Sequence, residues 1–352
     1  MTVDFLDRDT VERLPTVPLA SRALPADVRA ADGPEGAPDV LGHGPAGGWA
    51  ALWQLPGEGG ALVRWRSWTD AQVHEQVLHG VLERIYFTQP LSGGRVLLAS
   101  SRRLRADSSA QIWDARGDLI AEGDLGDALE HVLVTESDVI WVGFFDEALT
   151  GREPEGHGLV EFGVDLRPTW LYPWNTSLPD LSDCENLNVV GESVFLCPYW
   201  SHQLVEVSED TIVDYGIAPA RGARALLVDG HRMALIGGYG SEYDLITPFV
   251  IDRGQLLPVG SQGRLAVPEG EDVIHLRWSC RGAIGYADST AGHYQLSLND
   301  VFAALVDPRP PGDGSRRLNR AWRRREVRRR REGSDDRERC GGGGKGQDGA
   351  EC

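Results

Sequence analysis

The tetrapeptide Leu62-Val63-Arg64-Trp65 is the first of a series of strand-like segments that recur along most of the chain. Each copy is rich in β-branched, aliphatic or aromatic residues. The anchor residues of the series are Trp65, Trp113, Phe162, Val207, Ile251 and Leu298, which lie 48, 49, 45, 44 and 47 residues apart. A nearly fixed period of this length indicates a stacked or radial repeat architecture.

Each repeat also contains an earlier apolar strand, and most have a further strand before or after the pair. Clusters of Gly, Asp and Ser separate these segments and suit tight hairpins. A single four-stranded antiparallel unit cannot bury both of its faces, whereas radial packing of several units buries them and leaves only short edges. The sequence therefore predicts an all-β fold, a six-bladed β-propeller with four-stranded antiparallel blades, over residues 42–306.

The repeats resemble the β-propeller superfamily, with blades of the kelch, NHL and WD-repeat kind. Only Trp113-Asp114 forms a WD dipeptide, and the double glycine of kelch blades appears at Gly93-Gly94 and Gly237-Gly238 but is not repeated in every unit. The resemblance is to the superfamily and to no specific family within it. It implies that loops at one end of the central channel form the binding surface.

Two segments flank the predicted propeller. Residues 1–41 are rich in Pro, Ala, Asp and Gly and are predicted to form a flexible N-terminal arm, part of which could supply a strand elsewhere. Residues 307–352 are arginine-rich and then glycine-rich, and are predicted to form a disordered tail. We expect one end of the chain to close the ring by sharing a blade.

One segment between the first two predicted blades is ambiguous. Thr69-Asp70-Ala71-Gln72 resembles a helix capping box, and apolar residues follow at helical spacing over 73–85. Gly80 disfavours a helix there. A short helix and a non-helical connection both remain open at this point.

The charge of the chain is asymmetric. It has 35 basic and 53 acidic residues, and residues 315–352 contain 12 Arg and Lys345 but only 7 acids. The acidic remainder should repel nucleic acid and anionic membranes. The sequence has no apolar run long enough to span a bilayer and no secretion-signal pattern, so we expect a cytoplasmic monomer that does not bind membranes.

Several loops that follow predicted strands carry clustered aromatic and acidic residues. If the blades are in register, these loops lie on one face, where they could bind a protein, a peptide or a small molecule. The simpler interpretation is that these acidic loops are only solvated. The ligand-binding candidates are Asp146, Glu147, Tyr199, His202, Tyr239 and Tyr243.

Oxygen-bearing side chains suggest an alternative. Asp183, Glu185, Asn186 and Asp244 are ligand types that Ca²⁺ or another divalent cation prefers. Some six-bladed propellers are metal-dependent lactonases, in which a central cation polarises a carbonyl and activates water. The alternative is therefore a metal-dependent hydrolase or lactonase with its site at the mouth of the central channel.

The main prediction is a non-catalytic propeller that binds its partner through the loop face without a cofactor. The chain contains no GxSxG, HExxH, P-loop or GxGxxG motif, and its five cysteines lack metal-binding spacing. A third hypothesis concerns Arg316–Arg331, which could contact nucleic acid or an acidic partner, fold back on the acidic body, or have no role.

Overall fold

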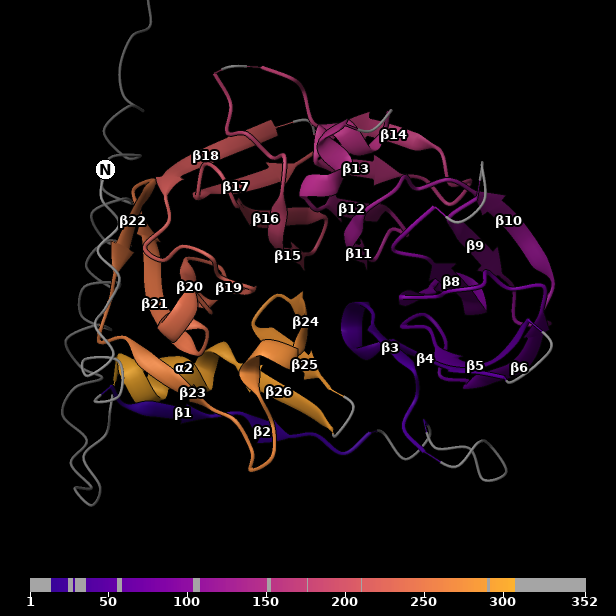
Figure 1. The fold of residues 1–352 in the computed structure, drawn as a ribbon, viewed down its shortest axis with the longest axis horizontal. Helices are drawn as coiled ribbons and strands as arrows, with labels where there is room; N and C mark the ends of the chain where they lie inside the picture. The colour runs from indigo at the N-terminus through magenta and orange to yellow at the C-terminus, as the bar shows by residue number, and fades with distance from the viewer. Residues whose placement is uncertain are drawn as a thin grey trace, which may run out of the picture. The chain divides into compact units, whose positions relative to one another are not determined.

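Antiparallel hairpins make up most of the computed structural model (Figure 1). The structure describes residues 14–24, 28, 36–55, 59–103, 108–150, 153–175, 177–209, 211–289 and 292–307. All of these lie in one unit, Met1–Pro308. The predicted tail, including Arg316–Arg331, lies outside the described residues except for Asp307.

Three sheets have four antiparallel strands each. The first contains β3 (Val40–His43), β4 (Trp49–Gln54), β5 (Gly60–Arg66) and β6 (His74–His79). The second contains β7 (Phe87–Leu91), β8 (Arg95–Ala99), β9 (Ala110–Trp113) and β10 (Leu119–Gly123). The third contains β11 (Leu129–Val134), β12 (Ile140–Phe144), β13 (Leu159–Phe162) and β14 (Pro168–Leu171).

Two larger sheets contain further four-stranded antiparallel groups. One group is β15 (Cys184–Val190), β16 (Ser193–Pro198), β17 (Gln203–Ser208) and β18 (Thr211–Ile217), and another is β19 (Ala225–Asp229), β20 (Arg232–Ile236), β21 (Leu245–Asp252) and β22 (Gln255–Pro258). The last is β24 (Arg277–Arg281), β25 (Ile284–Asp288), β26 (His293–Ser297) and β2 (Ala20–Ser21). A short parallel pairing of β15 with β24 joins two of these groups.

The first strand of each group faces a common centre (Figure 1). These inner strands contact one another in a closed cycle, in the order β3, β7, β11, β15, β19, β24 and back to β3. The last strand of a group is more exposed, as in β10 and β18. Apolar cores fill the space between neighbouring groups; Leu97 and Ile112 of the second sheet, for example, pack with Val132 and Phe162 of the third.

The segment predicted as an N-terminal arm contributes strands at the other end of the chain. β1 (Thr16–Pro18) pairs in parallel with β23 (Gly263–Ala266), and β2 pairs with β26. Figure 1 shows this indigo segment beside the orange strands. Residues from both ends of the described chain therefore share hydrogen-bonded sheets.

The prediction of an all-β fold built from four-stranded antiparallel sheets is confirmed. The helix considered after Thr69 is not present; β6 occupies this segment, and Gly80 follows it with a φ of 76°. The apolar residues at helical spacing do not share one buried face, because Val77 is 50% exposed on the outer strand β6. A helix that the sequence did not predict, α2 (Leu298–Leu305), follows β26 and packs on β1, β20 and β21.

Three cysteines, Cys184, Cys197 and Cys280, are buried free thiols. Cys184 and Cys197 belong to different apolar cores on opposite sides of the β15–β18 group, so they do not form a disulfide across β15 and β16. Within the described part of the chain, no helix is long and apolar enough to cross a membrane.

Candidate functional site

A cavity of about 630 Å³ lies where the inner strands begin. Every four-stranded group contributes to its lining, so side chains from the whole ring converge there. One lining residue from each group, in chain order, is Leu41, Gln89, His131, Glu185, Arg224 and Trp278.

Two side chains link the inner strands deeper in the ring. The guanidinium of Arg281 donates to the carbonyl of His43 at 2.8 Å, to Oε1 of Gln89 at 2.7 Å and to the carbonyl of Val134. Asn188 donates to the carbonyls of Leu226 and Gly282, at 2.7 Å and 2.8 Å. Because Gln89 both lines the cavity and accepts from Arg281, the guanidinium lies directly behind the cavity wall.

Two carboxylates, Asp183 and Glu185, lie at the start of β15 and line the cavity. The register of β15 against β16 shifts between Cys184 and Asn186, so Glu185 is the extra residue of a β-bulge. Such bulges redirect side chains and are common beside active sites. Burial, then the neighbouring charges of Asp146 and Glu130, raises the pKa of Asp183 to about 6.

The carboxyl group of Glu185 is mostly buried, and it also accepts a hydrogen bond. Burial raises the pKa of its carboxyl to about 7, although a hydrogen bond from Tyr239 and the charge of Arg224 act in the opposite direction. The Tyr239 hydroxyl donates to Oε1 of Glu185 at 3.0 Å. A carboxyl group whose pKa lies near 7 is able both to accept and to give a proton at neutral pH.

Tyr239 is held in place by a glycine and by other aromatic rings. A Cβ on Gly222 would lie 2.6 Å from the Tyr239 ring, so only glycine fits opposite it. Tyr199 and His202 pack against the same ring, with centroid distances of 5.9 and 6.4 Å. These two predicted ligand-binding residues therefore support Tyr239 from behind and do not themselves line the cavity.

Tyr243, another predicted ligand-binding residue, lines the cavity on the wall that carries positive charge. The guanidinium carbon of Arg224 lies 4.9 Å from the centroid of the Tyr243 ring. Arg224 also donates to the carbonyl of Ile274 at 3.1 Å. The cavity therefore has carboxylates on the β15 wall and a guanidinium on the β19 wall.

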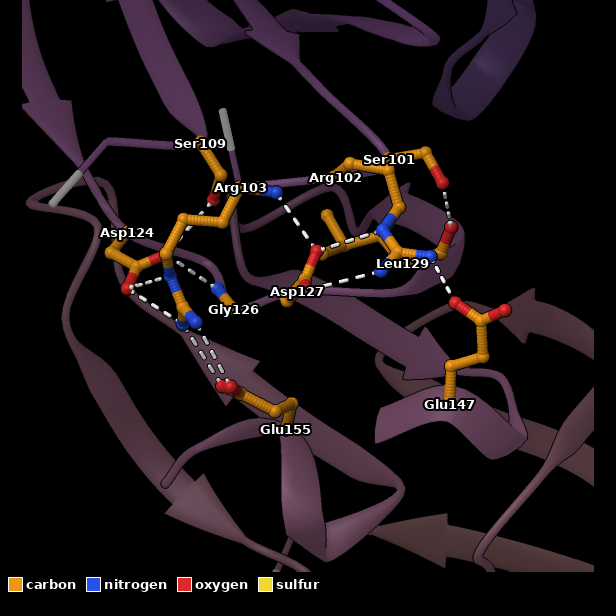
Figure 2. A network of polar contacts seen from close by, with 10 residues as sticks. All are labelled: Ser101, Arg102, Arg103, Ser109, Asp124, Gly126, Asp127, Leu129, Glu147 and Glu155. Atoms are coloured by element: carbon orange, nitrogen blue, oxygen red, sulfur yellow. Dashed lines mark hydrogen bonds and ion pairs between the residues drawn. The ribbon is translucent and has the colours of Figure 1, made fainter. Parts of the chain in front are cut away.

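Asp146 and Glu147, the remaining predicted ligand-binding residues, follow β12 and are both exposed. Asp146 lies close enough to Asp183 to raise its pKa. Glu147 instead accepts from Arg102, which also pairs with Asp127 (Figure 2). Neither side chain lines the cavity.

A second ion pair, between Arg103 and the buried Glu155, belongs to the same network of polar contacts (Figure 2). Arg103 donates to both carboxylate oxygens of Glu155, at 3.0 and 3.1 Å, and to Asp124 at 2.8 Å. The side chain of Glu155 is only 2% exposed. Ser101, two residues before Arg103, lines the cavity and donates to the carbonyl of Leu129 at 2.8 Å.

The four predicted metal ligands do not converge. Asp183 and Glu185 share the cavity, but the side chain of Asn186 bonds the backbone of Ala223 and Cys197. Asp244 accepts from Arg264 at 2.7 Å and lies outside the cavity lining. The described residues contain no group of three or more His, Cys, Asp or Glu side chains able to hold a metal ion, so the donor set does not fit a resident cation.

Several cavity residues had no signal in the sequence. Asp288 lines the cavity and accepts from His293 at 2.7 Å. Burial alone would raise the pKa of Asp288, but the hydrogen bond from His293 and the nearby His43 ring, whose Nε2 lies 3.5 Å from Oδ2, lower it to about 2. Gln89, His131 and Arg224 are single polar residues within or beside strands, and only the folded ring brings them together.

No family model matches the chain, and the search of curated proteins found no match. Among solved structures, a candidate 6-phosphogluconolactonase from Bacteroides uniformis is 13% identical with a TM-score of 0.45, covering 77% of this chain and 80% of that one. The periplasmic gluconolactonase PpgL of Pseudomonas aeruginosa is 14% identical with a TM-score of 0.46, covering 77% and 83%. A gluconolactonase from Xanthomonas campestris is 13% identical with a TM-score of 0.39, covering 77% and 98%.

These structures belong to the β-propeller superfamily, and at such identities the likeness concerns the fold alone. The main prediction, a non-catalytic binding propeller, is nevertheless wrong. The matched structures are described as a candidate 6-phosphogluconolactonase and two gluconolactonases. The cavity contains two carboxyl groups whose pKa values are raised to about 6 and about 7. Sequence patterns missed this because a pKa depends on burial and on distant neighbours.

Proposed function

We propose that the chain hydrolyses carboxylic esters, with cyclic esters (lactones) as the main substrate class, in the cavity at the start of the inner strands. One observation carries the proposal: Asp183 and Glu185 share this cavity, with pKa values raised to about 6 and about 7. A general acid or base works best when its pKa lies close to the operating pH.

The two carboxyl groups supply the proton transfers. Because their charges interact, the pair titrates as a unit and holds about one proton near neutrality. The ionised carboxylate takes a proton from water, and the oxygen of that water adds to the acyl carbon. The protonated carboxyl then gives its proton to the leaving oxygen as the carbon–oxygen bond breaks. One water is consumed, an acid and an alcohol are formed, and the pair returns to its starting protonation.

Direct attack by water is favoured over a covalent route. Ser101 lines the cavity, but its hydroxyl donates to the carbonyl of Leu129. Burial raises the pKa of the Cys184 thiol well above its ordinary value, which suppresses the nucleophilic thiolate. Since the donor set also does not fit a resident cation, we assign no step to a metal ion.

We further propose that the six antiparallel groups are the blades of a six-bladed β-propeller. The closed cycle of contacts between the inner strands supports this number. In this arrangement the N-terminal strand β2 completes the last blade as its outer strand. The active cavity then lies at the end of the central channel from which the inner strands start.

The test uses δ-valerolactone, γ-butyrolactone and p-nitrophenyl acetate with the full chain. Wild type should hydrolyse at least one of them, and Glu185→Gln should lower kcat/KM by roughly 100-fold or more, as expected for the loss of a proton-transfer group. Asp118→Asn, which changes a carboxylate that is 66% exposed, is the matched control and should be unchanged. An inactive wild type, or full activity of Glu185→Gln, would overturn the proposal.

A chelator arm separates this proposal from the metal-dependent alternative. The rates should stay the same after treatment with EDTA and after addition of Ca²⁺, Mn²⁺ or Zn²⁺. Activity that disappears with EDTA and returns with one of these ions would contradict the metal-free mechanism and restore the alternative.

A further inference from the structure

Gln89 lies on the inner strand β7 and lines the cavity, although only 4% of the residue is exposed. Its amide orientation is fixed by its partner. Arg281 donates to Oε1 of Gln89 at 2.7 Å, and a guanidinium has only donors. The oxygen of the amide must therefore face Arg281, so the NH₂ group of Gln89 points away from the guanidinium.

Arg281 cannot easily turn to release this amide. Two further donors of the guanidinium bind the backbone carbonyls of His43 and Val134, which belong to two other inner strands. Within the described part of the chain, no carboxylate pairs with Arg281. A guanidinium balanced only by neutral dipoles leaves positive charge behind the wall of the cavity.

The NH₂ group of Gln89 bonds no other described residue, since its single hydrogen bond is the one made by its oxygen. In the described structure, every fully buried side-chain nitrogen or oxygen without a partner is known, and the amide nitrogen of Gln89 is not one of them. It is therefore accessible, and the accessible space beside Gln89 is the cavity. The bond from the Arg281 cation to the amide oxygen polarises the amide and strengthens its N–H donors.

We propose that the amide NH₂ of Gln89 binds an anionic oxygen of the ligand, and that Arg281 is a positioning residue that holds this donor toward the cavity. The ligand class is a small molecule with a tetrahedral oxyanion. This inference rests on the proposed function and deepens it. When water adds to an ester, the carbonyl oxygen becomes such an oxyanion, and a fixed donor aimed at it lowers the barrier.

The test measures binding, which does not depend on turnover. The probe is the cyclic phosphonate analogue of δ-valerolactone, a stable tetrahedral anion, and the comparison ligand is δ-valerolactam, which has a neutral planar carbonyl. Isothermal titration calorimetry with the full chain gives both affinities. Wild type should bind the phosphonate more tightly than the lactam. Gln89→Met should weaken phosphonate binding by about 10- to 100-fold, the range for a hydrogen bond to a charged group, and affect the lactam much less.

Two further variants separate this role from a general loss of packing. Gln111→Met removes a buried amide that donates to Gly80 outside the cavity, so it should leave phosphonate affinity unchanged. Arg281→Met should weaken the phosphonate about as much as Gln89→Met does. In the Gln89→Met background, Arg281→Met should weaken binding less than it does in wild type, because the donor that it orients is already gone and only the positive charge behind the wall is lost.

Failure of the inference differs from failure of the proposed function. Glu185→Gln should still bind the phosphonate in a Gln89-dependent way while losing hydrolysis. Gln89-dependent binding by a wild type that hydrolyses nothing would support the oxyanion site and reject the hydrolase. Absent phosphonate binding, or equal affinity in wild type and Gln89→Met, would overturn the inference even if Glu185-dependent hydrolysis is found.

Discussion

The hydroxyl of Tyr239 donates a hydrogen bond of 3.0 Å to Oε1 of Glu185. The two residues are 54 positions apart, and they come from different antiparallel groups of the ring. The bond favours the ionised carboxylate, whereas burial favours the protonated one. The balance keeps the pKa of Glu185 at about 7, which is the value that the proposed chemistry needs.

Tyr239→Phe should move the pH dependence of catalysis. Removing the hydroxyl removes a contribution that lowers the pKa of Glu185, so this pKa should rise above its value of about 7. Because Glu185 has the higher pKa of the pair, it holds the shared proton and acts as the acid, so the falling limb of kcat/KM against pH should move to higher pH. Tyr199→Phe is the control, since Tyr199 contacts the Tyr239 ring and not the carboxylate. Identical limbs in wild type and Tyr239→Phe would contradict the assignment.

Stability should fall as pH rises through the range of the carboxyl pair. The folded-state pKa of Glu185 is raised from 4.5 to about 7, and that of Asp183 from 3.8 to about 6. A raised pKa means that the folded state binds the proton more tightly than the unfolded state does. The stabilisation is therefore complete below about pH 4 and lost by about pH 7. Urea unfolding across this range should show the decline, and Glu185→Gln should reduce it. A slope that is the same in both proteins would show that Glu185 is not the titrating group.

Gly222→Ala should separate Tyr239 from Glu185. A Cβ at this position would lie 2.6 Å from the ring, and the residue has a φ of 69°. Gly230→Ala is the matched control, because Gly230 has a φ of 59° and a Cβ added there would have nothing within 4 Å. Both variants should lose roughly 1–3 kcal/mol from backbone strain. Only Gly222→Ala should also lower kcat/KM and move its pH limb; equal catalytic effects in the two would refute this interpretation.

Glu155→Ala should be far more damaging than Glu147→Ala. Glu155 is 2% exposed and binds Arg103 through both oxygens, whereas the Glu147 side chain is 57% exposed. Removing Glu155 takes two charge-assisted hydrogen bonds from Arg103, which keeps its bond to Asp124, and should cost about 1.5–3 kcal/mol. An exposed pair contributes about 0–1 kcal/mol. Chemical denaturation measures both, and similar losses would contradict the difference expected from their burial.

The repeat period predicted the strands well because burial follows it. Trp65, Trp113, Phe162 and Val207 are all buried in the cores between neighbouring groups. The spacing of apolar residues misled where a strand is only partly buried. In β6, Val77 is 50% exposed although its spacing suggested the buried face of a helix.

The cavity could be anticipated only in part. Asp183, Glu185, Tyr239 and Tyr243 stood out because acidic and aromatic residues cluster in loops, and they line the cavity. Gln89 and Arg281 are 192 residues apart and belong to no local motif. Their role depends on two inner strands meeting across the ring, which a period in the sequence does not encode.

The most direct measurement of the central claim is the pH-stat rate of δ-valerolactone opening by wild type and by Glu185→Gln, both in the presence of EDTA. We predict that wild-type activity has a bell-shaped pH dependence with limbs near pH 6 and pH 7, and that the rate is lower by roughly 100-fold or more in the variant. Equal rates in the two proteins, or opening of the lactone by neither, would contradict the claim.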